Sequence, residues 1–475
     1  MNKPKRRIPV WAAVVGMIIT LVLGGGIGYF AHQPQSVQVS TNQQIPAGFD
    51  KVLKTYATIS QNYYRKPSDK KLADGAINGM LKSLDDPFSN YLQNTDATDL
   101  NTEISGSFGG IGATMAQTSD GVSVDALNSG SPAQKAGLKV GDTIVSVDGK
   151  SMAKKDINAV VSKVRGKIGT KVTVVVSRGN KQLSFTMERS KINVPSVTTS
   201  LDKTNKQIGI ITFSTFTETS GKQVKNAIKK LRKEGAQKFV LDMRGNPGGV
   251  LGEALKIDSM FLKNGQTILK VKPRKGKTEV YKAGREYDKG FKVTEPTVVL
   301  IDGNSASASE ITAAALNESA GIPLIGTKSY GKGTVQTVAD MGQGAELKLT
   351  IAKWLTPDGD WINHKGLQPT IKADYPAYAY TPSFTSDSIK PETVSEDAKS
   401  LQTVLNALGY NVGKVNGYYG ASTMAAVSKF QAANGLTASG TADSNTLSKL
   451  TQQLGTKINA NDNAMKAAVK ELDKK

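Results

Sequence analysis

Strand and helix patterns alternate over residues 200–380, and this alternation constrains the fold more than any other feature of the sequence. Short apolar runs such as KFVL and TVVLI alternate with helical patterns such as SGKQVKNAIKKLRKEG and SASEITAAALNE. A Lys-rich, hairpin-like stretch interrupts the pattern at 265–295. Such alternation is typical of an α/β domain. We therefore predict an α/β core for this part of the chain.

The composition limits the chemistry that this domain can perform. The 475 residues include no Cys and only two His, His32 and His364. The absence of Cys excludes thiol nucleophiles, disulfides, thiolate zinc sites and iron–sulfur clusters. A histidine-based triad or metal site has almost no candidates, so we predict no metal and no cofactor. A hydrolase built from this chain needs another base.

The N-terminus has the pattern of a membrane anchor. Lys3, Lys5, Arg6 and Arg7 precede an uncharged run over 8–31. At 1.5 Å per residue these 24 residues span about 36 Å, enough for a bilayer core of about 30 Å. Basic residues before the run predict a cytoplasmic N-terminus and an external bulk. A cleaved signal peptide is the alternative, disfavoured by the length of the run and the lack of an A-x-A site.

The net charge is +21, with 61 Lys and Arg against 40 acidic residues. Such a charge usually indicates binding to nucleic acid or to an anionic surface. An exported chain does not meet the chromosome, so we predict no nucleic-acid partner. We interpret the charge as attraction to anionic lipid headgroups or wall polymers, with a merely solubilising surface as the alternative.

Shifts in composition divide the rest of the chain into segments. Polar or Pro- and Ser/Thr-rich stretches are typical of linkers, and apolar residues repeating at three and four are typical of helices. The predicted divisions are 1–31 cytoplasmic stub and anchor, 32–45 linker, 46–103 N-terminal helical region, 104–190 glycine-containing strand domain, 191–375 α/β core, 376–392 linker, 393–455 small helical module, and 456–475 a polar tail, either frayed or a lone helix.

The segment N-S-A-S-A-S-E at 304–310 is the first candidate for catalysis. It follows the strand pattern TVVLIDG and opens a helix pattern. A serine hydroxyl at such a turn is exposed at the sheet edge, and the free amides of the first helical turn can hold an oxyanion. A serine nucleophile needs this geometry. A Ser-rich helix cap without a catalytic role is the alternative.

The segment G-T-K-S-Y-G-K-G-T at 326–334 holds Lys332 among glycines. It nearly matches a phosphate-binding loop, but Gly333 stands where a Ser or Thr must bind magnesium. If Lys332 is buried it can act as a base, because burial can supply the about 4–5 kcal/mol that lowers a lysine pKa from ~10.4 to ~7. Gln336 points to the same side and can hold the amine. An exposed loop lysine is the alternative.

The segment D-M-R-G-N-P-G-G at 242–249 follows the strand pattern KFVL. Gly248 and Gly249 expose backbone amides at a second strand end, and these can supply another oxyanion donor. A simple Gly/Pro turn is the alternative.

These three segments, in this order, resemble the carboxyl-terminal processing peptidases, the tail-specific Ser/Lys proteases of the S41 type. The resemblance implies that Ser307 is the nucleophile, Lys332 the general base and Gln336 its orienting partner. It also implies a protease core of the crotonase/ClpP-like kind. The amides that it assigns to the oxyanion hole are those of Ala308 and of Gly248 or Gly249.

The strand domain at 104–190 resembles a PDZ domain in its segments 108–112, 129–138 and 140–149. In such domains glycine amides cradle a free carboxylate while an edge strand pairs with the peptide. Arg165 is a candidate sensor of the bound peptide, with an ordinary surface arginine as the alternative. The residues that the resemblance assigns to binding the substrate C-terminus are Phe108, Gly109, Gly110, Ile111 and Gly112.

The two ends of the exported part carry further resemblances. Residues 85–91, DDPFSNY, resemble the helical N-terminal region of the family, which often mediates dimerisation. Residues 401–436 resemble the three-helix peptidoglycan-binding domain, although Asn416 stands where many members have Asp. The turn with Tyr418 and Tyr419 offers an aromatic platform for a sugar; a helical cap without ligand is the alternative.

We therefore predict a multidomain α+β protein with an N-terminal transmembrane helix, a PDZ β-barrel-like domain, an α/β protease core and a C-terminal three-helix module. The predicted function is a membrane-anchored serine endopeptidase on the cell-wall side that cleaves exported proteins near their C-termini. Its expected partners are protein substrates, peptidoglycan and the membrane, with a homodimer left open. A catalytically silent wall-binding PDZ scaffold and an acyl-CoA enzyme of the crotonase type are the alternatives. The presence of Ser307, Lys332 and Gln336 disfavours the silent scaffold. The PDZ and wall modules and the predicted export disfavour the acyl-CoA enzyme.

Overall fold

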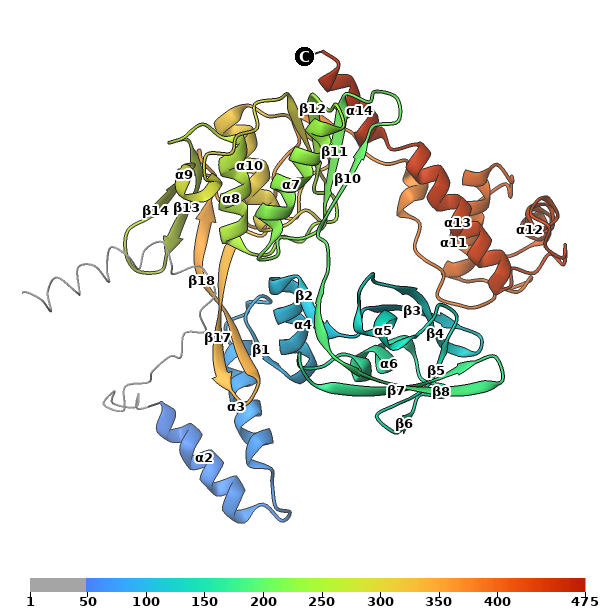
Figure 1. Ribbon diagram of the computed structural model, residues 1–475, viewed down its shortest axis with the longest axis horizontal. Helices are drawn as coiled ribbons and strands as arrows, with labels where there is room; N and C mark the ends of the chain where they lie inside the picture. Colours follow the sequence, from blue (N-terminus) through green and yellow to red (C-terminus); the bar gives the residue numbers. More distant parts are fainter. Residues whose placement is uncertain (1–47, 475) are drawn as a thin grey trace, which may run out of the picture.

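The computed structural model describes residues 48–474, which form an α/β core flanked by a smaller strand domain, a C-terminal helical module and a projecting pair of N-terminal helices (Figure 1). Among these residues no helix combines the length and apolar character needed to cross a membrane. The predicted anchor at 8–31 lies outside the described residues.

A six-stranded sheet forms the centre of the core, in the order β10-β11-β12-β15-β16-β19. Neighbouring strands from β11 onward are parallel, and β10 pairs antiparallel with β11. All five residues of β15 are buried, as expected for a strand covered on both faces. The strands are β10 (Val197–Leu201), β11 (Ile208–Phe213), β12 (Lys238–Asp242), β15 (Thr297–Ile301), β16 (Leu324–Gly326) and β19 (Ile371–Lys372). The predicted α/β alternation is confirmed.

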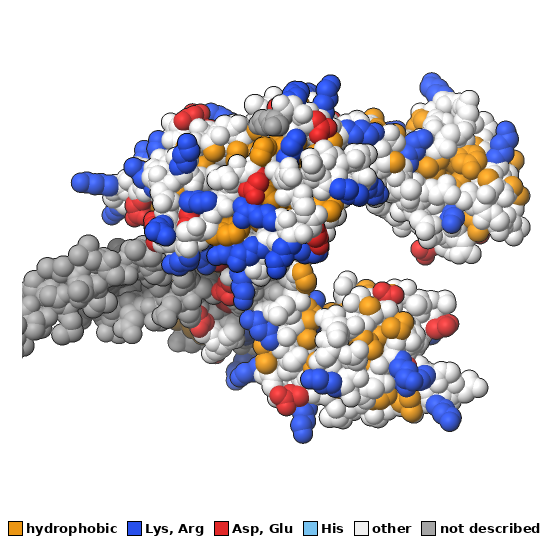
Figure 2. Space-filling model, turned by 45° about the horizontal axis from the view of Figure 1, so that its top comes forward, with side chains coloured by type: hydrophobic (Ala, Val, Ile, Leu, Met, Phe, Trp, Pro, Cys, Tyr) orange, Lys and Arg blue, Asp and Glu red, His pale blue; other side chains and the backbone are white. Residues whose placement is uncertain are grey.

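Three helices cover one face of this sheet: α7 (Ser220–Lys233), α8 (Leu251–Phe261) and α10 (Ala308–Ala314), the last continuing as a π-helical turn at Ala315–Ser319. Helix α7 is amphipathic. It buries Val224, Ile228 and Leu231 at helical spacing, and its last turn is basic. In the view of Figure 2, Lys and Arg side chains gather over the surface of the core.

The opposite face of the sheet is covered by the end of the chain. Helix α14 (Asn463–Leu472) buries Ala464, Ala468 and Leu472 against sheet residues that include Val240 and Leu300. The preceding helix α13 (Ser444–Ala460) extends the C-terminal module beyond its predicted end at 455. Of the two alternatives predicted for 456–475, a helix is present as α14, but it is not a lone one: its Ala464 and Ala468 lie four residues apart and pack on the sheet.

A second sheet, with the order β1-β18-β13-β14 and with β17 paired to β18, projects from the core. Strand β1 pairs with β18, so the N-terminal region is joined to the core by backbone hydrogen bonds. The elements are β1 (Asn90–Gln93), β13 (Thr267–Pro273), β14 (Glu279–Lys282), α9 (Arg285–Asp288), β17 (Thr334–Gly342) and β18 (Ala345–Leu355).

The strand domain, for which the sequence predicts a PDZ fold, is a sheet with the order β3-β4-β5-β7-β8, to which the short β6 adds beside β5. Strand β3 is an edge strand, and α6 packs next to it. The antiparallel ladder of β2 with β9 joins the domain to the rest of the chain. The elements are β2 (Ser107–Gly110), β3 (Ala113–Thr118), β4 (Gly121–Leu127), α5 (Pro132–Ala136), β5 (Thr143–Val147), β6 (Lys150–Ser151), α6 (Ile157–Val164), β7 (Lys171–Arg178), β8 (Lys181–Glu188) and β9 (Ser190–Asn193).

The C-terminal module packs α11 (Glu396–Leu408), α12 (Ala421–Ala433) and α13 around one small hydrophobic core. A single turn of 3-10 helix, Ala377–Tyr380, lies in the connection that precedes it. The two tyrosines of the predicted sugar platform differ. Tyr419 is fully buried and its hydroxyl donates to the Gly440 carbonyl at 2.7 Å, whereas Tyr418 is 46% exposed. Only Tyr418 is accessible, so the expected two-tyrosine platform is wrong in this respect.

The N-terminal helices α2 (Phe49–Asn62) and α3 (Asp69–Lys82) bury none of their residues in the structure described for 48–474. They project away from the core and the other domains (Figure 1). Helix α4 (Asn94–Ser105) follows them in the chain and lies beside the core. Phe49, Leu53, Tyr56 and Met80 are all more than one-third exposed. Amphipathic helices with an uncovered apolar face are unusual in a monomer.

Candidate active site

Ser307 lies at the turn between β15 and α10, where it is the N-cap residue of α10. Its backbone has φ 54° and ψ −114°, outside the regions that non-glycine residues ordinarily adopt. Such a conformation costs of order 1–3 kcal/mol and persists only where surrounding contacts enforce it. Gly248 is one of those contacts, because a Cβ placed on it would lie 2.9 Å from the Ser307 Cβ. The turn holds the serine side chain partly exposed at the sheet edge.

The carboxylate of Glu310 holds this turn in place through hydrogen bonds. Its side chain is fully buried, and one carboxylate oxygen accepts from the backbone N–H of Ser307 at 2.9 Å and of Lys332 at 2.8 Å. The other oxygen accepts from the Gly331 N–H at 2.7 Å and from the Ser329 hydroxyl at 2.5 Å. Bonds to a charged acceptor are the stronger kind. One carboxylate therefore ties the serine turn to the lysine loop.

Lys332 stands in a partly buried position. Its Nζ lies 4.6 Å from the centre of the Phe88 ring, which comes from the loop after α3. Burial is the main cause that lowers the pKa of Lys332 from 10.5 to about 8, and the nearby cation of Lys348 adds to it. The carboxylates of Asp86, Glu310 and Glu103 act in the opposite direction. At neutral pH a usable fraction of this lysine is uncharged.

Gln336 lies on β17, on the strand that follows the lysine loop. Its amide donates to the hydroxyls of Thr334 at 2.9 Å and Thr350 at 3.1 Å. Within the described part of the chain no hydrogen bond joins Lys332 Nζ to either Ser307 Oγ or Gln336. Glu310 joins the backbones of Ser307 and Lys332, whereas no hydrogen bond within residues 48–474 links the side chains of the three predicted residues in this conformation. Such bonds often form only with substrate present.

Two backbone segments offer donors beside the serine. Ala308 is the first residue of α10, so its N–H has no partner inside the helix. The Gly248 N–H donates to the Asn246 side-chain oxygen at 2.9 Å. No acceptor in residues 48–474 takes the Gly249 N–H. Asn246 in turn accepts at its carbonyl from the Ala306 N–H at 3.0 Å and the Ser309 hydroxyl at 2.9 Å. The glycine loop and the serine turn are thus bonded to each other directly.

Arg244 precedes this glycine loop and is largely buried, with 12% of its side chain exposed. Its guanidinium donates to both carboxylate oxygens of Asp242, at 2.9 and 2.7 Å. It also donates to both oxygens of Asp462, each at 2.8 Å, and to the Tyr375 hydroxyl at 2.6 Å. The sequence pattern pointed to the glycines of this loop but not to this arginine.

The five residues predicted to bind a substrate C-terminus divide between two environments. Phe108, Gly109 and Gly110 belong to β2 and pair with β9. Ile111 and Gly112 follow β2. Their carbonyls accept from Ala133 and Asn128, both at 2.9 Å, while their N–H groups have no acceptor among the described residues. These two amides therefore remain available to a ligand at the start of β3.

Arg165 ends α6 and reaches the same region. Its guanidinium lies 4.2 Å from the centre of the Phe108 ring, and its Nε is buried without a hydrogen-bond partner in the described chain. The next residue, Gly166, donates its N–H to the Gly109 carbonyl at 3.0 Å. The half-buried Arg165 is thus held at the junction of the strand domain and the β2–β9 ladder.

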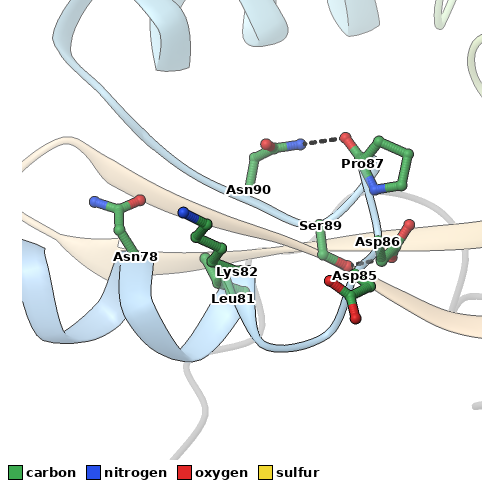
Figure 3. A pocket seen from close by; sticks show the side chains of 8 residues that line it. All are labelled: Asn78, Leu81, Lys82, Asp85, Asp86, Pro87, Ser89 and Asn90. Atoms are coloured by element: carbon green, nitrogen blue, oxygen red, sulfur yellow. Dashed lines mark hydrogen bonds between the residues drawn. The ribbon is translucent and has the colours of Figure 1, made fainter.

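The loop that carries Phe88 also lines a cavity of about 480 Å³ at the end of α3 (Figure 3). Within the loop, the Asp86 carboxylate accepts from the Ser89 hydroxyl at 2.6 Å, and Asn90 donates to the Pro87 carbonyl at 3.1 Å. No predicted catalytic residue is among those that line the cavity, which are Asn78, Leu81, Lys82, Asp85, Asp86, Pro87, Ser89 and Asn90.

Sequence reasoning missed two contributors to the site. Glu310 stands three residues after Ser307, and a Ser-x-x-Glu spacing is the signature of a capping box, so the pattern itself pointed to it. Phe88 carried no such signal, because its contact with Lys332 joins segments more than two hundred residues apart.

The matched domain families agree with this organisation. Peptidase family S41 matches residues 207–373, and a PDZ domain matches 123–178. A putative peptidoglycan binding domain matches 394–450, and the activating protease CtpB N-terminal domain matches 27–96. The chain is a serine-type peptidase of the S41 class.

Similarity to individual proteins extends over nearly the whole chain. It is 40% identical over 464 residues to the carboxy-terminal processing protease CtpA of Bacillus subtilis, with 97% of each chain covered. It is 36% identical over 468 residues to CtpB of the same organism, covering 95% of this chain and 97% of CtpB. A probable CtpA-like serine protease of Staphylococcus aureus is 35% identical over 474 residues, covering 98% and 93%. The chain belongs to the carboxy-terminal processing proteases, and the resemblance inferred from its motifs is confirmed.

Proposed function

We propose that this processing protease is anchored in the cell membrane with its catalytic part on the wall side, and that Ser307 and Lys332 perform the cleavage. One observation carries the catalytic proposal. A lysine whose pKa is lowered to about 8 shares the carboxylate of Glu310 with a serine held in a strained turn. An amine that is partly neutral near pH 7 can accept the proton of a serine hydroxyl.

In this mechanism the Ser307 Oγ attacks the carbonyl carbon of the scissile peptide bond while its proton passes to neutral Lys332. The negative charge on the carbonyl oxygen is stabilised by the Ala308 N–H and by an amide of the Gly248–Gly249 pair. The protonated lysine then gives its proton to the leaving amine, and water hydrolyses the acyl-enzyme. Gln336 orients Lys332 once its side chain leaves Thr334 and Thr350, to which it is now bonded.

Cleavage of an unfolded test protein by single-residue variants tests the catalytic proposal. Ser307→Ala and Lys332→Ala should each abolish cleavage at unchanged thermal stability, because residues that act as a unit fail together. Lys328→Ala is the matched control, since Lys328 is an exposed lysine of the same loop. Substantial cleavage by either dyad variant would overturn the assignment.

We further propose that the PDZ domain selects substrates by their C-terminus. The free edge of β3 beside α6 can add a peptide strand, and the free amides of Ile111 and Gly112 can bind its carboxylate. Arg165 would sense the bound peptide through its contact with Phe108. Replacement of Arg165 should then change the response to a free-acid peptide while leaving the peptide's affinity similar.

The remaining modules suit a protein held between membrane and wall. We propose that residues 8–31 form the anchor and that the C-terminal module binds peptidoglycan, with the exposed Tyr418 at its surface. The uncovered apolar residues of α2 and α3 support a homodimer formed through these helices. Sedimentation of the chain lacking residues 1–47, compared with a Leu53→Asp variant, tests the dimer.

A further inference from the structure

The guanidinium of Arg244 joins three parts of the chain that are far apart in sequence. Asp242 lies two residues before it at the end of β12, Tyr375 follows β19, and Asp462 caps the start of α14. Tyr375 and Asp462 stand on either side of the C-terminal module, one before it and one after it. The two ends of that module therefore converge on one arginine.

The glycine loop also begins directly after Arg244. The next amide, of Gly245, donates to Asp302 at 2.9 Å, and three residues further on Gly248 packs against Ser307. A side chain fixed at the base of a short loop limits where the amides of that loop can lie. Displacements well below 1 Å at oxyanion donors already alter their energy, because those bonds are strongest at 2.7–3.1 Å.

Asp462 holds its position without help from Arg244. Helix α14 is anchored by its own apolar residues on the sheet. At its far end, Lys238 Nζ donates to the Leu472 carbonyl at 2.8 Å, and the Asn205 amide donates to the Asp473 carboxylate at 2.9 Å. The carboxylate of Asp462 is thus a fixed point against which the guanidinium is oriented.

Without Asp462 the arginine would keep Asp242 but lose two of its charge-assisted bonds. Asp242 lies only two residues away and moves with the same loop. Tyr375 contributes one neutral hydroxyl. Asp462 is therefore the acidic partner that ties Arg244 to a separate element.

We propose that Asp462, assisted by Tyr375, is a positioning residue for catalysis: the last helix of the chain orients the oxyanion loop through Arg244. The inference rests on the proposed function, since it matters only if amides of this loop bind the oxyanion. It makes the segment beyond the C-terminal module part of the catalytic apparatus.

The variant Asp462→Asn tests this with little disturbance elsewhere. Asn caps helices about as well as Asp, so the bond from the Met465 N–H at 2.9 Å can persist. Its amide group, however, brings N–H donors toward a guanidinium that also only donates, and the charge is lost. The matched control is Asp443→Asn, which makes the same change at the N-cap of α13, away from Arg244.

We expect Asp462→Asn to lower kcat for a short peptide roughly tenfold while KM and the melting temperature stay near those of the control. Complete loss of one oxyanion donor costs about 10²–10³ in kcat, and a donor held less firmly should cost less. Asp462→Glu should recover part of the loss. A peptide aldehyde, which forms an oxyanion with the serine, should bind about tenfold more weakly, whereas the matching peptide alcohol should not.

Three outcomes would overturn the proposal: equal kcat values for the two Asn variants, a kcat loss that follows a lowered melting temperature, or equal weakening of aldehyde and alcohol. Failure here is distinguishable from failure of the proposed function. If only the positioning role of Asp462 fails, wild type and Ser307→Ala still differ fully in cleavage. If the proposed function fails, the two do not differ.

Discussion

The pH dependence of cleavage is set by the environment of Lys332. Burial lowers the pKa of this lysine from 10.5 to about 8. At pH 7 about one molecule in ten then carries a neutral amine, against about one in 3000 at the ordinary pKa, a gain of about 300-fold. This gain corresponds to about 3 kcal/mol. The neutral form is the active one, so activity should rise with pH and level off above about 9.

Two single charges near the site should move this profile in opposite directions. Lys348 lowers the pKa of Lys332, so Lys348→Met should shift the midpoint to higher pH and reduce the rate at pH 7. Glu103 raises that pKa, so Glu103→Gln should shift the midpoint to lower pH. In both variants the plateau rate in mild alkali should match that of wild type, because only the proportion of neutral amine changes.

The assay is kcat/KM for a fluorogenic peptide measured from pH 5.5 to 10 at constant ionic strength. Lys272→Met serves as the control, because Lys272 is an exposed lysine of the same sheet that does not influence Lys332. A profile that is already flat from pH 5.5 would refute a lysine base. Shifts of the two charge variants in the same direction would refute the electrostatic account.

Three further predictions follow from single contacts. Glu310→Gln should abolish cleavage and lower the free energy of unfolding by about 3 kcal/mol or more, since an amide group cannot accept the four donors it would meet; denaturant titration measures this. Tyr418→Ala should weaken co-sedimentation of the protein with peptidoglycan at unchanged stability, whereas Tyr419→Ala should destabilise the module by about 3–5 kcal/mol. Amidation of a substrate's C-terminus should weaken its binding roughly ten- to hundredfold, and deletion of the PDZ domain at 104–190 should remove the difference; equal cleavage of both forms by the intact enzyme would contradict this.

Local patterns predicted the parts of the site that neighbouring residues determine. A strand pattern that runs into a helix pattern places Ser307 at a turn, and glycines around Lys332 indicate a tightly folded loop. The capping spacing of Glu310 was visible as well, but its bonds to the lysine loop depend on how two distant segments approach each other. The Phe88 ring against Lys332 depends on β1 pairing with β18, a contact across more than 250 residues.

The same limit explains the misjudged C-terminus. The small residues Ala464 and Ala468 lie four apart and mark one face of α14 as apolar, but a polar sequence around them masks the pattern. Nothing local indicates that this face fits a sheet whose first strand begins more than 250 residues earlier. Burial of Tyr419 beside an exposed Tyr418 is similarly decided by the tertiary arrangement of three helices rather than by the Gly-Tyr-Tyr-Gly turn alone.

The position of α14 also fixes the order in which the enzyme can mature. A chain leaves the ribosome N-terminus first, so Ile208, Val240, Val298 and the other apolar residues on that face of the sheet stay uncovered while the C-terminal module is still being synthesised. The helix that covers them, α14, follows that module in the chain. Nascent protein can therefore form every other element of the core before the sheet acquires its second cover.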